Sequence, residues 1–232
     1  MAGLADLSRR STAGELMDDP ALDPAVYDRC IRDLATLNRV TLTHRPVLQW
    51  LAAAAPDDGF SVLDVAYGDG DLLRAISRWA AKRGVAVRLG GIDLNPRSAA
   101  AARAATPAGM AIDYVTGDVF DFEPEVAPDF IVTSQFTHHL DDAALVRLLG
   151  WMDRHARRGW FITDLHRHAI PYYGFRYLAR LAGWHRIVAL DGTVSIARGF
   201  TAREWRARLD EAGLAARVGW RFPFRHAVAR LK

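Results

Sequence analysis

The stretch VLDVAYGDGDLL, residues 62–73, decides the fold. It joins a continuous apolar run, typical of a buried parallel strand, to an amphipathic helix. The turn between them contains Gly68 and Gly70, and glycine is needed where backbone bends sharply and approaches a ligand closely. In an open α/β sheet, such a turn lies at the carboxyl edge of the strands, where ligands bind. The stretch therefore predicts a ligand site at the start of a helix.

Short apolar runs and helical patterns alternate around this stretch. Pro46 divides the helical spacing of residues 25–55 into two helices, and the tail 216–232 gives two strands broken at Pro223, a predicted hairpin. This alternation predicts a doubly wound parallel sheet. The expected strands are 60–66, 85–93, 112–118, 130–136 and 159–165, and the expected helices are 72–82, 96–105 and 141–157.

The chain is expected to form one domain behind a polar arm. Residues 1–24 are polar and predict an N-terminal arm or short helix, followed by a single domain over 25–232. Residues 166–200 are aromatic and basic without clean alternation, and 168–200 is expected to be an insertion that caps the substrate site. Thr201 and Glu204 have the spacing of a capping box, which predicts the start of the next helix.

Composition narrows the class of protein. Half of the 232 residues are hydrophobic, so a full core can be buried, and the net charge is only +3. Basic residues alternate with acids, as in solvated helix faces, so nucleic-acid binding is not expected. The single cysteine excludes a disulfide within the chain. Without a secretory signal or a long apolar run, we expect a soluble cytoplasmic protein with no membrane span.

The acids near the glycine turn indicate the kind of ligand. Asp93 ends the next strand, where a carboxylate can accept hydrogen bonds from both ribose hydroxyls. The dinucleotide fingerprint requires a third glycine where this chain has Leu73. Asp69 and Asp71 would repel a pyrophosphate but tolerate a sulfonium and an ammonium. These residues favour S-adenosylmethionine (SAM) over a nicotinamide cofactor.

Four motifs extend this reading to a known family. VLDVAYGDG, GIDLNP, TGDVFDF and PDFIVTSQFTHHL resemble, in order, motifs of the class I SAM-dependent methyltransferases of the UbiE-like kind, over about residues 35–232. The resemblance implies a Rossmann-like, seven-stranded sheet of order 3-2-1-4-5-7-6 with the last strand antiparallel, SAM as cofactor and S-adenosylhomocysteine (SAH) as product. SQFTHHLDD and DLHRHAIPYYGFRYL also resemble methyltransferases encoded beside type III polyketide synthases, which implies a phenolic, resorcinol or quinone-like acceptor.

The resemblance also implies the cofactor contacts. Gly68 and Gly70 would line the methionine part, Asp93 would hold the ribose, and Asp118 with the amide of Val119 would hold the adenine. Ala66 and Tyr67 depart from the family, which has a glycine and then a small residue, so the Ala66 methyl group is expected to crowd the methionine end. The full expected set is Asp64, Ala66, Tyr67, Gly68, Gly70, Asp93, Leu94, Asp118, Val119, Ser134 and Arg39.

Histidines are the expected catalytic residues. Methyl transfer is an in-line displacement, and an oxygen nucleophile must also lose its proton, for which histidine suits neutral pH. His139 and His166 follow two strands at the ligand edge and are expected to act as a base or to orient the acceptor. The expected substrate contacts are His138, Tyr172, Tyr173 and His44. No spaced set of metal ligands stands out, so no metal is expected.

Several alternatives remain open from the sequence. The chain is either a methyltransferase, which methylates an oxygen of a phenol or a carbon of an activated ring, a SAM-binding enzyme with cyclase or decarboxylase chemistry, or a catalytically silent SAM-binding module. A nicotinamide enzyme is the most distant alternative. The expected partner is a small aromatic molecule, and a homodimer is possible on this reading.

Overall fold

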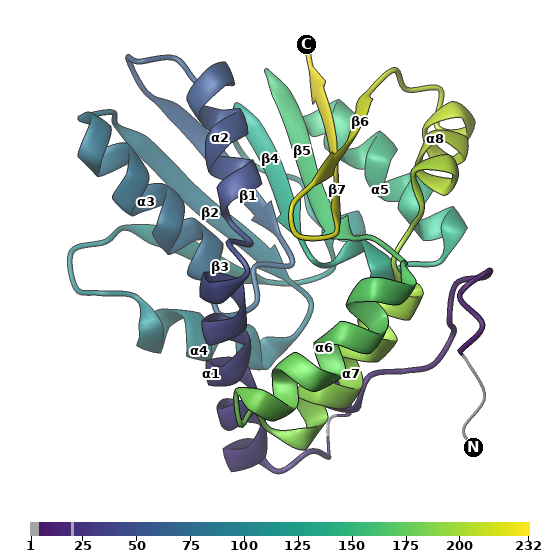
Figure 1. Cartoon of the computed structure of the whole chain (residues 1–232). Coiled ribbons are helices and arrows are strands. Elements are labelled where there is room, and N and C mark those ends of the chain that lie inside the picture. The colour runs from purple at the N-terminus through teal and green to yellow at the C-terminus, as the bar shows by residue number, and fades with distance from the viewer. Residues whose placement is uncertain (1–4, 20) are drawn as a thin grey trace.

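A seven-stranded sheet forms the centre of the computed structural model, which describes residues 5–19 and 21–232 (Figure 1). Its order is β3-β2-β1-β4-β5-β7-β6, and β7 runs antiparallel to β5 and β6, so the predicted topology is confirmed. Residues 1–4 and 20 of the expected arm lie outside the described residues. The strands are β1 Phe60–Val65, β2 Val87–Asp93, β3 Ile112–Thr116, β4 Phe130–Ser134, β5 Gly159–Leu165, β6 Arg217–Arg221 and β7 Arg225–Leu231.

The helices begin largely where the sequence predicts. Pro46 lies in the first turn of α2, Thr201 and Glu204 form the predicted capping box of α8, and Asp141 caps α5. The helices are α1 Pro24–Val40, α2 Arg45–Ala54, α3 Asp71–Arg83, α4 Pro96–Ala105, α5 Asp142–His155, α6 Ala169–Leu181, α7 Arg186–Arg198 and α8 Ala202–Glu211. Three short 3-10 turns complete the set: η1 Leu16–Asp18, η2 Val119–Asp121 and η3 Thr137–His139.

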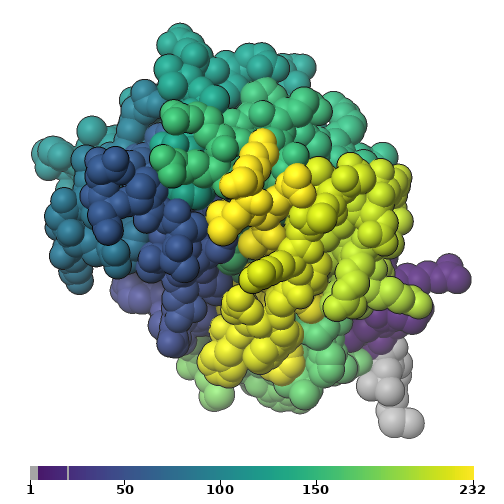
Figure 2. All heavy atoms as spheres, turned by 90° about the horizontal axis from the view of Figure 1, so that it is seen from above, coloured from purple at the N-terminus to yellow at the C-terminus, as the bar shows by residue number. Residues whose placement is uncertain are grey.

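Two apolar layers cover the sheet because side chains alternate along each strand. On β1, Leu63 and Val65 belong to the core shared with α5 and α8, whereas Phe60 and Val62 belong to the core shared with α2 and α3. The β6–β7 hairpin lies at the surface between α2 and α8 (Figures 1 and 2). Within the described residues, no helix is long and apolar enough to cross a membrane.

Several expected strands are shorter than predicted. The expected strand 130–136 ends at Ser134, because Gln135 has a φ of 55°, in the left-handed region, and cannot continue an extended strand. The expected strands 85–93 and 112–118 are 87–93 and 112–116. Residues 168–200, which showed no clean pattern, form the antiparallel pair α6 and α7 (Figure 1).

The carboxyl edge of the parallel strands faces α1, α6 and α7 (Figure 1). The described part of the N-terminal arm packs along α7, where the amide of Ser11 donates to the carbonyl of Ala197 at 3.0 Å. The amides of Leu16 and Met17 each donate to the buried Asp191 carboxylate at 2.9 Å. These bonds fix η1 above the sheet edge.

Three histidines cluster where β5 pairs with β7. The ring centroid of His166 lies 4.5 Å from that of His226 and 5.4 Å from that of His168. Burial, with the charges of His166 and Arg206, lowers the pKa of His226 to about 4, although Asp164 opposes the shift. Burial also lowers the pKa of His166, helped by His168 and Arg167. The folded state therefore keeps His226 neutral.

Mild acid is expected to destabilise the protein through His226. Its folded-state pKa lies below the unfolded value of about 6.5, so the unfolded chain takes up the proton first. The stability contributed by the neutral ring is fully present above about pH 6.5 and falls as the pH drops towards 4. Urea unfolding of wild type and His226→Leu at pH 5 and pH 7 measures this: the variant should lose less stability on acidification, and equal losses would contradict the assignment.

Candidate active site

A cavity of about 480 Å³ lies at the carboxyl edge of the sheet. One end is formed by the loop after β1 together with Ser134 and Gln135, and the other by η3, the N-terminal arm and α7. Aliphatic and aromatic side chains of α1, α6, α7 and the β6–β7 turn form the wall between the two ends. The cavity thus joins the predicted cofactor loop to a polar end at the histidines.

The loop after β1 contains three residues in the left-handed region. Ala66, Gly68 and Gly70 have φ values of 60°, 57° and 76°. A Cβ at Gly70 would lie 2.5 Å from the Tyr114 hydroxyl, so glycine is required there for packing. A Cβ at Gly68 would meet no described atom within 4 Å, so this backbone is open to a ligand. Ala66 holds its conformation despite a cost of about 1–2 kcal/mol for a residue with a Cβ.

Asp93 ties the end of β2 to this loop. One carboxylate oxygen accepts from the amide of Gly68 and the other from the amide of Asn95, both at 2.8 Å. Burial raises the pKa of Asp93, while these hydrogen bonds favour its charged form. Each oxygen keeps further acceptor capacity, which two ribose hydroxyls can use.

Five buried polar atoms of cavity-lining residues have no partner in the described part of the chain: Nδ1 of His44, Oδ1 of Asp64, the hydroxyl of Tyr67, Oγ of Ser134 and Nε of Arg225. Two of them, Oδ1 of Asp64 and Oγ of Ser134, are oxygens at the ends of β1 and β4. Burial, with the charges of Asp71 and Asp93, raises the pKa of Asp64 well above its usual range. Buried polar atoms are normally hydrogen-bonded, so these two call for a donor in the cavity. The ammonium group of SAM is such a donor.

A side-chain network borders the same end of the cavity. The Asp71 carboxylate accepts from Asn38 at 2.8 Å and contacts Nε2 of His44 at 2.9 Å. Burial opposes charge on Asp71, but His44 and Asn38 outweigh it and lower the pKa of the carboxyl. The side chain of Gln135 in turn donates to Asn38 at 2.8 Å. Sequence reasoning missed Asn38 and Gln135 as site residues, because their side chains carry no charge.

The other end of the cavity is built on η3. Nδ1 of His138 lies 2.7 Å from Oδ1 of Asp164, a fully buried carboxylate that also accepts from the His138 amide at 2.7 Å and from the Thr137 hydroxyl. Burial disfavours the imidazolium, but the carboxylates of Asp164 and Glu15 outweigh it and raise the pKa of His138 to about 9. Glu15 comes from the N-terminal arm, and sequence reasoning did not connect it to this site.

The structure brings together eight of the predicted site residues on the cavity wall: Asp64, Ala66, Tyr67, Gly68, Ser134, His44, His138 and His139. Four others lie off this wall, at the end of β2 or just after β2 and β3: Asp93, Leu94, Asp118 and Val119. Leu94 and Asp118 are exposed, so the surface that is expected to bind the adenosine part of SAM is open to solvent. The buried Gly70 caps α3, and Arg39 is exposed.

The predicted residues after β5 do not line the cavity. Among the described residues, Leu165 reaches the wall but His166 does not. On α6, the helical period turns Pro171, Phe175 and Leu178 inward, while Tyr172 and Tyr173 lie on another face. The Tyr173 hydroxyl instead accepts from the amide of Ala5 at 2.9 Å.

Comparisons with known proteins agree with this geometry. Residues 62–159 match the family described as methyltransferase domain. The chain resembles magnesium protoporphyrin IX methyltransferase from Synechocystis PCC 6803 with bound SAH, with a TM-score of 0.58, 15% identity and coverage of 93% of this chain and 90% of that one. None of the curated proteins matches the sequence.

Two further solved structures show the same fold. A SAM-dependent methyltransferase from Aquifex aeolicus has a TM-score of 0.62 and 20% identity, covering 87% of this chain and 96% of that one. The plantazolicin methyltransferase BpumL, in complex with a triazolic desmethylPZN analogue and SAH, has a TM-score of 0.63 and 15% identity, covering 90% of this chain and 92% of that one. Residues 62–159 thus match a methyltransferase domain, and the chain has the fold of solved SAM-dependent methyltransferases, some of which contain bound SAH.

The side chains and backbone around this cavity fit SAM. The open backbone at Gly68 leaves room beside the loop, and the unpartnered oxygens of Asp64 and Ser134 can accept from the ammonium of its methionine part. Asp93 offers its free acceptor capacity to the ribose. Ala66 lines the cavity together with Gly68, and the expected crowding by its methyl group stays a prediction.

Proposed function

We propose that the protein methylates a hydroxyl oxygen of a flat, largely apolar small molecule of the phenolic, resorcinol or quinone-like kind. The observation that carries this proposal is the single cavity that runs from the cofactor loop to the polar end at His138 and His139. An acceptor lying along the wall would place its hydroxyl between the cofactor's methyl group and the polar side chains, so that the same oxygen can attack the methyl carbon and give up its proton. Its ring would contact apolar surface over most of its area.

The cavity wall suits a planar ring. Leu34 of α1, Phe175 of α6 and Ile196 of α7 all line it, together with Phe224 of the β6–β7 turn. Aromatic and aliphatic side chains bind flat apolar groups through area burial and ring contacts. We propose that residues 168–200, as α6 and α7, form the substrate cap of the domain that spans 25–232.

SAM and the polar side chains have separate roles in the proposed reaction: SAM donates the methyl group, and the side chains accept the proton. When bound, SAM supplies a methyl group on a sulfonium, an electrophile that needs positioning rather than activation. The acceptor oxygen forms the new O–C bond as the S–C bond breaks, its electron pair remaining on the sulfur of SAH. The phenol proton passes to the polar cluster of Glu15, His138 and His139, whose exposed fractions of 10%, 3% and 27% for the side chains leave His139 the most accessible.

A panel of acceptors tests the proposal. Protein, SAM and a set of phenols, alkylresorcinols and hydroquinones are incubated, and SAH and methyl ethers are measured by mass spectrometry. We expect SAH and a methyl ether in equal amounts with at least one acceptor. SAM binding without SAH formation from any acceptor would favour a silent binding module, and conversion of an acceptor without methyl gain would favour cyclase or decarboxylase chemistry.

The two histidines expected as bases give a matched pair of variants. His139→Ala is expected to lower turnover about 100-fold or more, the usual range for a proton-transferring group, with SAM affinity unchanged. His166→Ala, at a histidine that is off the described cavity wall, is expected to stay within a few-fold of wild type. Steady-state kinetics and calorimetry measure both effects, and the reverse order of losses would assign the base to His166.

A further inference from the structure

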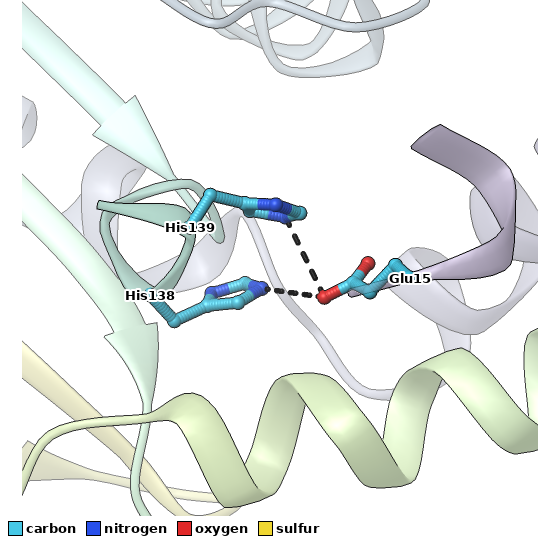
Figure 3. Close-up of side chains that lie close together, drawn as sticks. All are labelled: Glu15, His138 and His139. Carbon is cyan, nitrogen blue, oxygen red and sulfur yellow. Dashed lines mark ion pairs between the residues drawn. The ribbon is translucent and has the colours of Figure 1, made fainter. Parts of the chain in front are cut away.

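Three side chains from two distant parts of the sequence converge at the polar end of the cavity. Glu15 of the N-terminal arm faces His138 and His139 of η3, and Figure 3 shows the carboxylate pointing at both rings. Oε1 of Glu15 lies 3.6 Å from Nε2 of His138 and 3.7 Å from Nε2 of His139. These separations are too long for good hydrogen bonds.

We propose that Glu15, His138 and His139 bind a divalent transition-metal cation of the Zn²⁺ type. Zinc lies about 2.0–2.2 Å from imidazole nitrogen and carboxylate oxygen, so neighbouring ligand atoms of a tetrahedral ion are about 3.4 Å apart. The observed separations need only a small closure to meet that value. Two imidazoles and one carboxylate favour zinc, iron or cobalt over magnesium or calcium, which prefer oxygen ligands.

Asp164 orients the first of these ligands. Its carboxylate lies 2.7 Å from Nδ1 of His138 and accepts a hydrogen bond from it, so Nε2 is the ring nitrogen that faces Glu15 and that binds a metal once the metal has displaced its proton. A carboxylate behind a ligating histidine is the usual outer-shell arrangement at metal sites, and it fixes the tautomer and the ring orientation. Asp164 is itself fully buried and held by the Thr137 hydroxyl, so the ring has little freedom.

The remaining neighbours hold the other two ligands. The Ser195 hydroxyl donates to Oε1 of Glu15 at 2.7 Å, and Oδ2 of Asp18 lies 3.6 Å from Nδ1 of His139. Nη1 of Arg198 is 4.0 Å from Oε1 of Glu15, and this side chain also donates to the carbonyls of η3. The carboxylates of Glu15, Asp18 and Asp164 thus lie around the two rings, whereas the guanidinium groups of Arg10 and Arg198 donate to backbone carbonyls of η3.

The three ligands leave coordination positions free on the cavity side, since all three line the cavity. A metal with an open position there could bind the acceptor oxygen and lower the pKa of its hydroxyl, and the proton would then leave to water, because the three ligand atoms that bind the metal cannot also accept it. This role rests on the proposed function, whereas metal binding itself does not.

Zinc titration of the full-length protein tests the site. Chelator-treated protein is titrated with ZnCl₂ by calorimetry at neutral pH, without SAM or acceptor, and Co²⁺ is added separately to record visible d–d bands. We expect saturable one-to-one binding. Glu15→Gln and His139→Gln should each weaken it about 100-fold or more, and Asp164→Asn about 10–100-fold, as outer-shell changes do.

A control pair exists elsewhere in the chain. Nε2 of His155 lies 2.9 Å from Oε2 of Glu123, but among the described residues this pair has no third metal-ligating side chain beside it. His155→Gln should therefore leave the zinc affinity unchanged. Circular dichroism confirms that each variant is folded. Wild type that fails to bind Zn²⁺, or Glu15→Gln and His139→Gln that bind it as tightly as wild type, would overturn the proposal. Such a failure leaves methyl transfer standing, whereas metal-bound protein that forms no SAH with any acceptor would overturn the proposed function alone.

Discussion

Asp93→Ala is expected to weaken SAM binding about 100-fold or more. The carboxylate can accept from both ribose hydroxyls, and each hydrogen bond to a charged group contributes about 1.5–3 kcal/mol. The same carboxylate holds the Gly68 amide at 2.8 Å, so its loss also frees the loop that faces the methionine part. Calorimetric titration with SAM and with SAH measures the change in Kd.

Two further variants test whether the loss of SAM affinity is specific to Asp93. Asp118→Ala, at the exposed acid predicted to meet the adenine, should weaken SAM binding by only about 10-fold, since water competes for an exposed hydrogen bond. Asp113→Ala, on the exposed side of β3, should leave the Kd unchanged. An Asp93→Ala protein that is folded and binds SAM like wild type would remove Asp93 from the cofactor site.

Arg167→Ala is expected to lower the free energy of unfolding by about 3–5 kcal/mol, the usual cost of breaking a buried ion pair. The side chain is buried and donates to both carboxylate oxygens of Glu204, at 2.6 and 3.0 Å. It also donates to the carbonyls of Gly199 at 2.6 Å and Leu7 at 2.9 Å. One guanidinium thus joins the segment before α6, the start of α8 and the arm.

Thermal unfolding checks this expectation. For a chain of this size the Tm of Arg167→Ala should fall by roughly 10 °C. Arg167→Lys should lose part of this stability, because an ammonium cannot reproduce the two-pronged contact with Glu204. Arg203→Ala, at an exposed arginine of α8, should stay within about 0.5 kcal/mol of wild type. Equal Tm values for Arg167→Ala and Arg203→Ala would show that the buried contacts contribute little.

Most helices and strands could be predicted from the sequence, because each depends on apolar periodicity, proline, glycine or capping residues within its own segment. The apolar run 60–65 and the glycine turn after it predict β1 and the start of α3, and Pro46 and the Thr201 capping box mark helix starts. The sheet order came from the family resemblance rather than from periodicity. The predicted end of β4 lies two residues too late, because glutamine rarely adopts the left-handed conformation that Gln135 has here.

The site was only partly predictable for a different reason. Residues at strand ends, such as Asp64 and His138, can be placed because parallel strands end at one edge. Glu15 reaches the same place through the arm, whose path depends on contacts such as those with Asp191 that no local pattern encodes. Tyr172 and Tyr173 were assigned by residue type, but the direction of a helix face requires knowing how α6 is rotated against its neighbours.

The left-handed alanine at position 66 has a consequence for how the loop meets its ligand. Left to itself, an alanine would leave the left-handed region, so the rest of the fold has to supply the free energy that keeps Ala66 there. Part of it comes from Asp93, which binds the amide of Gly68 two residues further on. The loop that meets the ligand is therefore under backbone strain, and it keeps its shape only as long as contacts such as this one hold.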